Sequence, residues 1–422
     1  MRSRVILHSD LNNFFASVET VLNPEFKGKP LIVCGDPKQR KGVVLAKNEE
    51  AKRYGIKTAE TVASAVAKCP HVLRTGTHFG DYKYYSAKVR EIYERFTDLV
   101  EECSIDECSL DMTASQYLFG SGVEIAEKIR KAVKEELGLT VSIGVSFNKV
   151  FAKLASEMKK PDAVTEIPEI GFEKIVHPLP VTDLLYVGKS TASTLSKYSI
   201  RTIGDLANAD EAMICKLLGK RGRVLRKYAR GEDDEPVKVK KDKEDLKSIG
   251  NSSTLPVSLT SWEEIKRWFY VLAESVTGRL READVGRAST VHIVVRDDNL
   301  EDKTWQTKIP PTLLCSEVAE TAFKLFCANW SVAKPVRMLG ITVSGFDYHI
   351  EQMSLVDFTD DGELRKKKER AENAVYEIRK KYGFNTLQRG VLFADEKLSG
   401  LDLRKENQPR TGEPPVHDTD EN

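Results

Sequence analysis

The stretch V-I-L-H-S-D at residues 5–10, together with S-I-D-E-C-S-L-D at 104–111, decides how the chain folds. The first stretch is mainly apolar and ends on Asp10, which is typical of a strand that places an acid at its C-terminal end. The second lies across a predicted pair of strands, with Asp106 and Glu107 in the middle. The sequence therefore predicts that Asp10, Asp106 and Glu107 lie on neighbouring strands of one sheet.

These three carboxylates have the arrangement that binds divalent cations. Transfer of a phosphoryl group to a sugar hydroxyl uses two cations roughly 4 Å apart, held by a few carboxylates. Because adjacent residues of a strand point to opposite faces, Asp106 and Glu107 share a site only if the strand is twisted or the site lies at its edge. The alternative is that all three are ordinary surface carboxylates, and spacing alone does not exclude it.

Helical and extended patterns alternate around these acids and predict an α+β sheet with helices packed on one face. Residues 232–247 are almost wholly charged and predict a solvated linker. A second α+β unit follows, and then a polar tail with one charged helix. The predicted helices are 12–22, 48–54, 60–68, 82–97, 123–137, 149–158, 262–280, 316–329 and 363–382, and the predicted strands are 5–10, 30–34, 42–46, 99–103, 107–112, 140–145, 290–296, 304–309 and 336–346.

Length and composition restrict the class of protein. With 422 residues, 41% hydrophobic and 31% charged, the chain suits a folded protein of about two to four domains. No apolar run is long enough to cross a bilayer, and the first residues contain no signal-peptide core. We therefore expect a cytoplasmic protein with no membrane partner. The seven cysteines include no C-x-x-C pair, and we expect free thiols.

Charge is distributed in blocks, although the net charge is only +1. Residues 1–90 sum to +8 and residues 91–111 to −7, and Lys216–Arg230 contain seven basic residues and no acid. Such blocks suit a protein with a track for a polyanion and a separate acidic centre that binds metal.

Six strings of sequence follow one another in an order and spacing that resemble the Y-family, or translesion, DNA polymerases, in particular the bacterial polymerase IV-like branch. The resemblance covers about residues 4–390. The strings are H-S-D-L-N-N-F-F-A-S-V-E (8–19), S-I-D-E-C-S-L-D (104–111), V-S-I-G-V-S-F-N-K-V-F-A-K-L-A-S-E-M-K-K-P-D (141–162), V-T-D-L-L-Y-V-G-K-S-T-A-S-T-L (181–195), K-S-I-G-N-S-S-T-L (247–255) and R-M-L-G-I-T-V-S-G-F (337–346).

The resemblance implies a multidomain α+β fold in which a ferredoxin-like palm carries a small fingers insertion. It further implies a helical helix-hairpin-helix thumb and an α+β little finger. The implied boundaries are palm 1–22 and 76–165, fingers 23–75, thumb 166–231, linker 232–245, little finger 246–348 and tail 349–422.

The implied activity is template-directed, low-fidelity addition of deoxynucleotides to a primer 3′ end on damaged DNA. The partners would be primer–template DNA and deoxynucleoside triphosphates, and we expect a monomer. Asp10, Asp106 and Glu107 match the catalytic ligands of two Mg²⁺ ions, with the Leu11 carbonyl as a further ligand. Mg²⁺ prefers such hard oxygen donors. The histidines, including His8, have no ligand spacing, and we expect them to be structural.

Four residues match the nucleotide site of that family. Phe15 matches the steric gate that excludes a 2′-hydroxyl, while Phe14 is either part of the same site or simply core. Lys160 matches a phosphate-binding lysine, and Lys52 stands where the fingers usually offer an arginine.

Two departures affect this site. Glu49 replaces the usual tyrosine and cannot donate to a phosphate, and Asn12 replaces the usual acid or small polar residue. These changes put the strength of nucleotide binding in doubt, but not the metal site.

Two stretches are expected to contact DNA phosphates. Residues 181–195 resemble a helix-hairpin-helix, in which backbone N–H groups bind phosphate without reading sequence. Tyr186 replaces the first glycine of its G-x-G turn, which weakens the match. A second hairpin carries the basic run 218–227, and packing of helices alone is the alternative. The expected contacts are Gly188, Lys189, Lys220, Arg221 and Arg223.

The segment Q-M-S-L-V-D-F at 352–358 resembles the sliding-clamp-binding peptide of bacterial polymerases. Gln352, Leu355 and Phe358 would be its anchors, and packing of these side chains onto the little finger is the alternative. Two other functions are alternatives. A catalytically inactive or weak DNA-binding accessory subunit would be expected to lack one of the acids, and a nucleotidyl cyclase would not explain the thumb and little finger.

Overall fold

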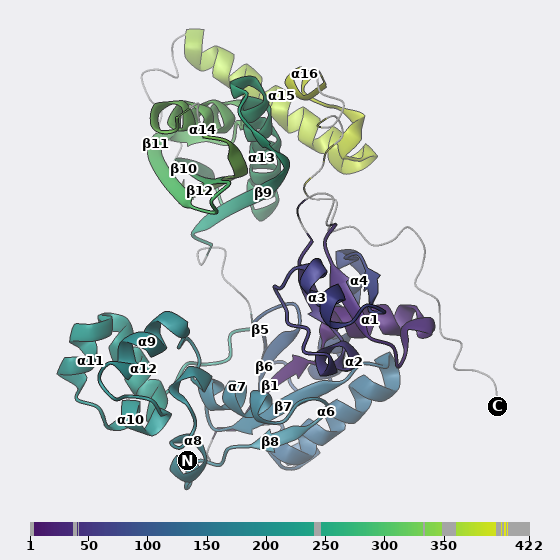
Figure 1. Cartoon of the computed structure of the whole chain (residues 1–422), viewed down its shortest axis with the longest axis vertical. Helices are drawn as coiled ribbons and strands as arrows, with labels where there is room; N and C mark the ends of the chain where they lie inside the picture. Colours follow the sequence, from purple (N-terminus) through teal and green to yellow (C-terminus); the bar gives the residue numbers. More distant parts are fainter. Residues whose placement is uncertain are drawn as a thin grey trace.

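The computed structural model describes residues 4–36, 40, 42–239, 246–331, 334–347, 360–393, 398, 401 and 403. Three sheets organise them, with five, four and three strands. In Figure 1 the four-stranded sheet lies at the top, and the five-stranded sheet lies below it with a group of short helices to its left. Among the residues described, no helix is long and apolar enough to cross a membrane. The prediction of a multidomain α+β fold is confirmed.

The five-stranded sheet has the connectivity of a ferredoxin-like fold. Its strand order is β5-β6-β1-β7-β8. The chain runs from β1 through α4 to the β5–β6 hairpin and then through α6 to β7, which is the split βαβ pattern. The first four strands are antiparallel neighbours, and β8 adds a parallel edge strand. The bounds are β1 Ile6–Leu11, α4 Phe79–Glu94, β5 Val100–Glu102, β6 Glu107–Asp111, α6 Gly122–Leu137, β7 Val141–Ser146 and β8 Val164–Glu166.

Both faces of this sheet are covered, whereas the sequence predicted helices on one face. Consecutive residues of β1 point to opposite faces. Leu7 packs into the core formed with α4 and α6, while Ile6 packs against Ala152 of α7 (Lys149–Met158). The close approach of α7 requires Gly144 of β7, because a Cβ there would collide with the α7 backbone.

The predicted linker is anchored in its first half. Val237 is buried against Ile6 and Ala152, and the Lys238 N–H donates to the Glu101 carboxylate over 2.8 Å. Val237 and Asp233 are buried, whereas the other residues of 232–239 are exposed, so the segment is anchored to the sheet at two points and is otherwise solvated as predicted. Residues 240–245 lie outside the part of the chain that the structure describes.

A smaller unit is inserted between β1 and α4. Its sheet has the order β3-β2-β4, with β2 and β4 parallel. Asn48 caps α2 by accepting from the Ala51 N–H, and Thr61 caps α3 in the same way through Ser64. The elements are α1 Phe14–Leu22, η1 Pro24–Phe26, β2 Leu31–Cys34, β3 Val44–Lys47, α2 Glu49–Arg53, α3 Val62–Lys68 and β4 Leu73–Thr75.

A helical unit follows β8. Its core continues into the five-stranded unit through Phe151 and Leu154 of α7, so the two pack together. Its elements are α8 Phe172–Val176, η3 Val181–Asp183, α9 Lys189–Ser196, α10 Ile203–Asn208, α11 Glu211–Leu218 and α12 Lys220–Ala229. A short helix, α5 Gln116–Phe119, precedes α6 in the five-stranded unit.

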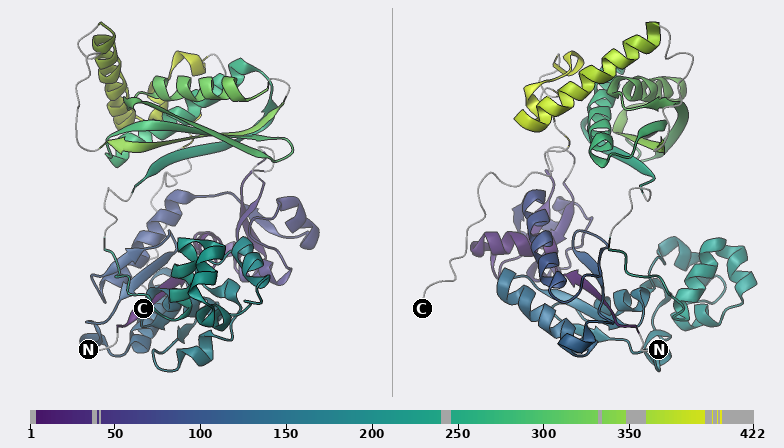
Figure 2. Two further views of the ribbon diagram at one scale, coloured as in Figure 1. Left: turned by 90° about the vertical axis from the view of Figure 1, so that its left-hand side faces the viewer. Right: turned by 180° about the vertical axis from the view of Figure 1, so that it is seen from behind.

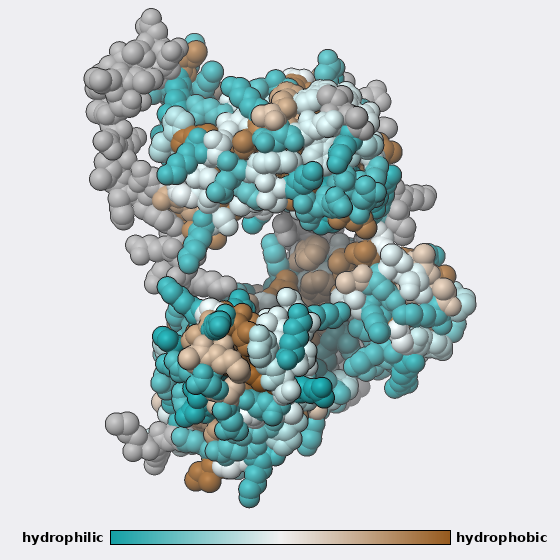
Figure 3. Space-filling view, turned by 60° about the vertical axis from the view of Figure 1, so that its left-hand side comes forward, coloured by the Kyte–Doolittle hydropathy of each residue, from teal (hydrophilic) through white to brown (hydrophobic). Residues whose placement is uncertain are grey.

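The four-stranded sheet has the order β11-β10-β12-β9 and is antiparallel throughout. In the left view of Figure 2 its strands face the rest of the chain and its helices lie on the opposite side. In Figure 3 a gap separates this unit from those below it, with hydrophilic residues on its left and hydrophobic residues on its right. The bounds are β9 Ser248–Leu259, α13 Trp262–Ala283, β10 Arg287–Asp297, β11 Asp302–Thr312, α14 Cys315–Asn329 and β12 Val336–Asp347.

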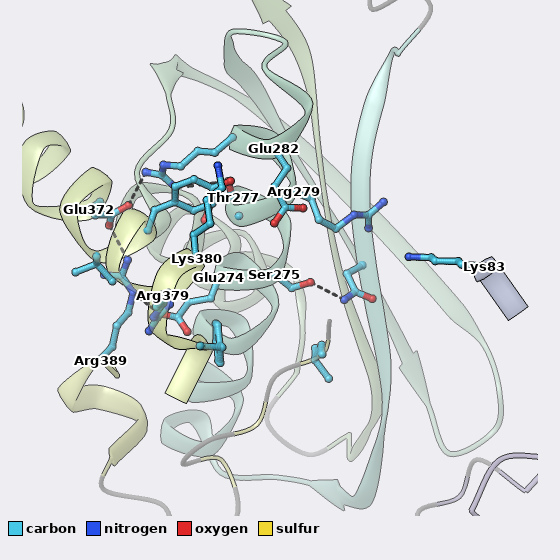
Figure 4. Close-up of a pocket in the computed structure, with 18 residues that line it drawn as sticks. Lys83, Glu274, Ser275, Thr277, Arg279, Glu282, Glu372, Arg379, Lys380 and Arg389 are labelled. Atoms are coloured by element: carbon cyan, nitrogen blue, oxygen red, sulfur yellow. Dashed lines mark hydrogen bonds and ion pairs between the residues drawn. The ribbon is translucent and has the colours of Figure 1, made fainter. Parts of the chain in front are cut away.

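The charged helix predicted in the tail is α15 (Asp360–Tyr382), and it packs on α13 instead of standing in solvent. Buried Glu274 of α13 accepts from Arg379 and Arg389 at 3.2 and 2.9 Å. Glu372 of α15 binds Arg281 and Arg389 at 3.1 and 2.8 Å (Figure 4). A cavity of about 1020 Å³ lies beside this network, and Lys83 of α4 also lines it. The next elements are η6 Phe384–Thr386 and α16 Gly390–Phe393, and Leu392 joins the core of the unit.

Candidate active site

The C-terminal end of β1 and the start of β6 form the centre of the site. Asp10 lies directly opposite Glu107 in the antiparallel register, and Asp10 is only 7% exposed. Ligand atoms of His8, Asp10 and Glu107 lie within 4.8 Å of one another, the grouping best suited to a cation among the described residues. The sequence placed Asp10 and Glu107 on neighbouring strands, and the structure brings their carboxylates together.

Asp106 belongs to the same backbone framework, but its carboxylate is directed elsewhere. Its carbonyl accepts from the Leu11 N–H over 2.9 Å, which fixes the turn against the end of β1. Its Oδ1 accepts from the Ser104 hydroxyl at 2.6 Å, and Asp106 is not part of the group within 4.8 Å. Asp106 and Glu107 differ in direction because only Glu107 is paired in the sheet.

Two lysines from the α7 region meet these acids. Lys153 Nζ lies 3.2 Å from Asp10 Oδ2 and 2.8 Å from Glu107 Oε1. Lys160 Nζ lies 2.9 Å from Asp10 Oδ1. Both lysines also bind Glu157, at 2.8 and 3.0 Å. The carboxylates therefore face a concentration of positive charge from one side.

Sequence reasoning did not select Lys153. It stands in an otherwise mainly apolar stretch of α7, between Ala152 and Leu154, both of which are buried. A lysine flanked by core residues has to direct its ammonium toward a partner, because an unpaired buried charge is costly. Its position between two core residues, together with Glu157 one helical turn later, was the feature of the sequence that could have indicated a buried ion pair at Lys153.

His8 was expected to be structural, yet it lies in the ligand group. It is 2% exposed, and its Nδ1 is 3.3 Å from the Ser109 hydroxyl. Its Nε2 has no hydrogen-bond partner and is 3.6 Å from Glu107 Oε2. The spacing of two residues between His8 and Asp10 places both on one face of β1, which was the signal in the sequence.

Burial and charge shift the pKa values in opposite directions. Burial raises the pKa of Asp10, against the effect of Lys160 and Lys153. The contact with His8 lowers the pKa of Glu107, against burial and assisted by Lys153. Burial opposes the charged form of Lys153, but hydrogen bonds to Glu107 and Glu157 outweigh it and raise the pKa of this ammonium. The site thus combines at least one firmly ionised carboxylate with a firmly protonated lysine.

Phe15 is held by stacking against the core of the five-stranded unit. Its ring lies 4.2 Å from that of Tyr82 at an interplanar angle of 10°. The Tyr82 hydroxyl donates to fully buried Glu19 over 2.7 Å. Phe14, by contrast, is 4% exposed and belongs to the core under α4. Of the two adjacent aromatics, only Phe15 is partly exposed.

Glu49 and Asn12, the two residues that depart from the family's pattern, both make specific contacts. Glu49 Oε1 accepts from Asn13 over 3.0 Å and lies 3.4 Å from Lys52 Nζ, so its charge is directed at the lysine. Asn12 donates to the Ser142 hydroxyl at 2.9 Å and accepts from the Asp162 N–H at 2.8 Å. Asn12 thereby links Asp162, two residues after Lys160, to the sheet through hydrogen bonds.

The expected DNA contacts lie on two adjacent hairpins of the helical unit. Gly188 is the N-cap of α9 and Lys189 its first residue, while Lys220, Arg221 and Arg223 lie in the first turn of α12. Arg223 binds Glu211 at 2.9 Å. The expected clamp-binding residues Gln352, Leu355 and Phe358 lie outside the described residues.

The sequence matches two family models, described as the impB/mucB/samB family over residues 9–157 and the impB/mucB/samB family C-terminal domain over residues 246–355. Asp10 and Glu107 both lie within the first match. Among curated relatives, the chain is 44% identical over 399 residues to DNA polymerase IV of Acetivibrio thermocellus, covering 94% of this chain and 100% of the relative. It is 36% identical to DNA polymerase IV 1 of Bacillus subtilis, covering 96% and 97%.

Solved structures agree with this relationship. A Y-family DNA polymerase chimera superimposes with a TM-score of 0.72 at 25% identity, covering 82% of this chain and 100% of the chimera. The likeness therefore extends over most of the chain. The chain belongs to the impB/mucB/samB family and is a Y-family DNA polymerase of the DNA polymerase IV type.

Proposed function

We propose that this chain extends a primer 3′ end on a DNA template, and that it continues across damaged bases. The observation that carries the proposal is the pairing of Asp10 with Glu107 on adjacent strands, with Lys153 and Lys160 converging on the same oxygens. A metal-dependent polymerase needs both features, because it must hold cations and a triphosphate beside each other.

In this proposal the ferredoxin-like unit is the palm, 1–22 with 76–165, and the inserted three-stranded unit is the fingers, 23–75. The helical unit 166–231 is the thumb, and residues 246–348 are the little finger. The gap in Figure 3 lies between the little finger and the other units, where a duplex would be bound.

The donor set fits divalent cations. Asp10 and Glu107 offer hard carboxylate oxygens, and an unpaired ring nitrogen of His8 faces them. We assign two Mg²⁺ ions to Asp10, Glu107, Asp106 and the Leu11 carbonyl. When bound, they would favour deprotonation of the primer hydroxyl and offset the charge of the triphosphate and the departing pyrophosphate. Binding of Asp106 requires its side chain to leave Ser104.

The reaction forms a bond between the primer 3′-oxygen and the α-phosphorus and breaks the bond from that phosphorus to the bridging oxygen. Lys160 is placed to release Asp10 and bind the triphosphate, since its side chain is 25% exposed. Lys52 contributes a second cation from the fingers. The Phe15 ring, fixed by Tyr82, lies under the sugar and excludes a 2′-hydroxyl.

DNA is held through its phosphates by Gly188, Lys189, Lys220, Arg221 and Arg223, which gives binding without sequence preference. The proposed partners are primer–template DNA and deoxynucleoside triphosphates, and a monomer suffices for this chemistry. We place the enzyme in the cytoplasm, where bacteria keep their chromosome. We further propose that residues 352–358 bind a sliding clamp.

The direct test is primer extension on undamaged and lesion-bearing templates, with and without Mg²⁺. We expect extension of both templates only when the cation is present. DNA binding without extension under every condition would favour the accessory-subunit alternative, and extension after complete chelation of divalent cations would overturn the metal assignment.

A further inference from the structure

Tyr186 occupies a backbone position that is usually unfavourable for its residue type. It is the third residue of a turn in which the Val187 N–H donates to the Leu184 carbonyl over 3.1 Å. Its φ is +68°, in the left-handed region where a side chain is strained and glycine or asparagine is preferred. A tyrosine in such a position requires a compensating interaction.

Burial does not supply that compensation. Its neighbours in the turn, Leu184 and Val187, are 2% and 6% exposed and hold the turn on the core of the thumb. Tyr186 itself is 58% exposed. The strained residue therefore has its side chain directed away from the core.

The ring of Tyr186 crosses from the first hairpin of the thumb to the second. The Arg221 guanidinium lies over it, 5.3 Å from the ring centroid, and the ring of Tyr228 lies 6.4 Å away. Arg221 and Tyr228 are seven residues apart on α12, which places them on one face of the helix. Tyr186 thus adds an exposed contact between the two expected phosphate-binding hairpins, outside the core that they share.

Arg221 also differs from the neighbouring arginines in how its charge is used. Arg223 and Arg226 bind Glu211 at 2.9 and 3.4 Å, and Arg230 binds Glu232 at 2.6 Å. Within the described residues, Arg221 has no carboxylate partner, and its guanidinium instead makes a cation–π contact with the Tyr186 ring. An aromatic ring orients a guanidinium without neutralising it, so the charge remains available to an anion.

We propose that Tyr186 is a positioning residue for DNA binding: it holds the Arg221 guanidinium in the direction of a backbone phosphate and couples the two hairpins of the thumb. This inference rests on the proposed function, because it assumes that the thumb binds DNA. The inference gives Tyr186 a role that it exerts through Arg221. Tyr186 stands at this turn in place of the usual glycine, and its backbone is strained there.

The test measures binding of the full chain to a primer–template duplex as a function of salt concentration. Each phosphate contact of a duplex contributes about 0.9 to the slope of log K against log salt. Arg221→Gln should lower the slope by about that amount and weaken binding roughly three- to tenfold. Tyr186→Gly should produce most of the same loss, while Tyr186→Phe, which keeps the ring, should bind like the wild type.

Two further measurements separate positioning from packing. Tyr186→Gly should leave the thermal midpoint nearly unchanged, because relief of the strained φ offsets the loss of the exposed ring contacts, whereas a packing role would lower it. In an Arg221→Gln background, Tyr186→Gly should cause no further loss of affinity, since both changes remove one contact. Lys197→Gln removes a positive charge from the far end of α9 and should bind DNA like the wild type.

Wild-type affinity and slope in Tyr186→Gly would overturn the inference, as would additive losses in the double variant or an equal loss in Tyr186→Phe. These results would leave the proposed function standing if the wild type still bound and extended DNA. A wild-type chain that shows no salt-dependent binding to primer–template would instead refute both the proposed function and this inference.

Discussion

Asp10, the fifth residue of β1, lies directly opposite Glu107, the first residue of β6, and a single ammonium group, that of Lys153, binds both carboxylates. Strand register fixes this pairing, because the two backbones hydrogen-bond on either side of it. Lys153 offsets the repulsion that two close carboxylates would otherwise cause. The arrangement keeps the acids together, with a cation beside them.

Glu107→Gln and Asp106→Ala should each reduce primer extension by more than about a hundredfold, because a carboxylate that holds a catalytic cation contributes several kcal/mol to transition-state stabilisation. Duplex affinity should remain, since phosphate contacts elsewhere dominate it. Glu102→Gln is a matched control in the same hairpin, because Glu102 binds Arg90 and not the site. Full activity in Asp106→Ala would show that this residue is not a metal ligand.

Phe15→Ala should admit ribonucleotides by removing the ring that stacks on Tyr82. We expect discrimination against ribonucleotides to fall at least about tenfold, or ~1.4 kcal/mol, with a modest change in use of deoxynucleotides. Phe15→Tyr keeps the ring and should keep the discrimination. The measurement is single-nucleotide incorporation with matched triphosphates, and equal sugar selectivity in Phe15→Ala and wild type would make Phe15 simply a core residue.

Gly144→Ala should destabilise the palm by about 3 kcal/mol or more, because its Cβ would meet the backbone of α7, which cannot move without shifting the Lys153 contacts. Calorimetry should show the first unfolding transition at a lower temperature. Gly76→Ala is the control, since nothing lies within 4 Å of a Cβ there. An unchanged transition in Gly144→Ala would contradict the close packing of α7 on β7.

Glu274→Gln should loosen α15 from the little finger. The carboxylate is almost fully buried and binds Arg379 and Arg389, so its loss leaves buried positive charge and costs about 3–5 kcal/mol. Limited proteolysis should cut near α15 faster than in wild type. Glu263→Gln, on the same helix but 86% exposed and 3.9 Å from Arg267, should cost less than about 1 kcal/mol. Equal cleavage of both variants would mean that other contacts hold α15.

Binding to a sliding clamp should depend on Gln352 and Leu355. A weak peptide contact suffices for function, because tethering to a ring on DNA raises the effective local concentration. A calorimetric titration of the cognate clamp with wild type and with Gln352→Ala/Leu355→Ala should detect binding only for the wild type. Equal binding by both would exclude this segment, while the polymerase assignment would be unaffected.

The sequence by itself determined the elements that depend on local periodicity. The predicted helix at residues 149–158 has the observed bounds, and the predicted strands at 5–10 and 107–112 each agree with the structure to within about a residue. Apolar spacing and local stop signals such as Pro161 operate over a few residues, so they can be recognised without tertiary information. The order of motifs along the chain was likewise sufficient to indicate the family.

Only the tertiary structure decided which side chains meet. The contact of Lys153 with Asp10 joins residues 143 positions apart. The inclusion of His8 beside Glu107 depends on strand register. The same holds for Val237, which is buried although charged residues surround it in sequence, and for Tyr186, whose strained turn brings it onto Arg221. Such contacts depend on distances between segments remote in the chain, and no local pattern of residue types encodes those distances.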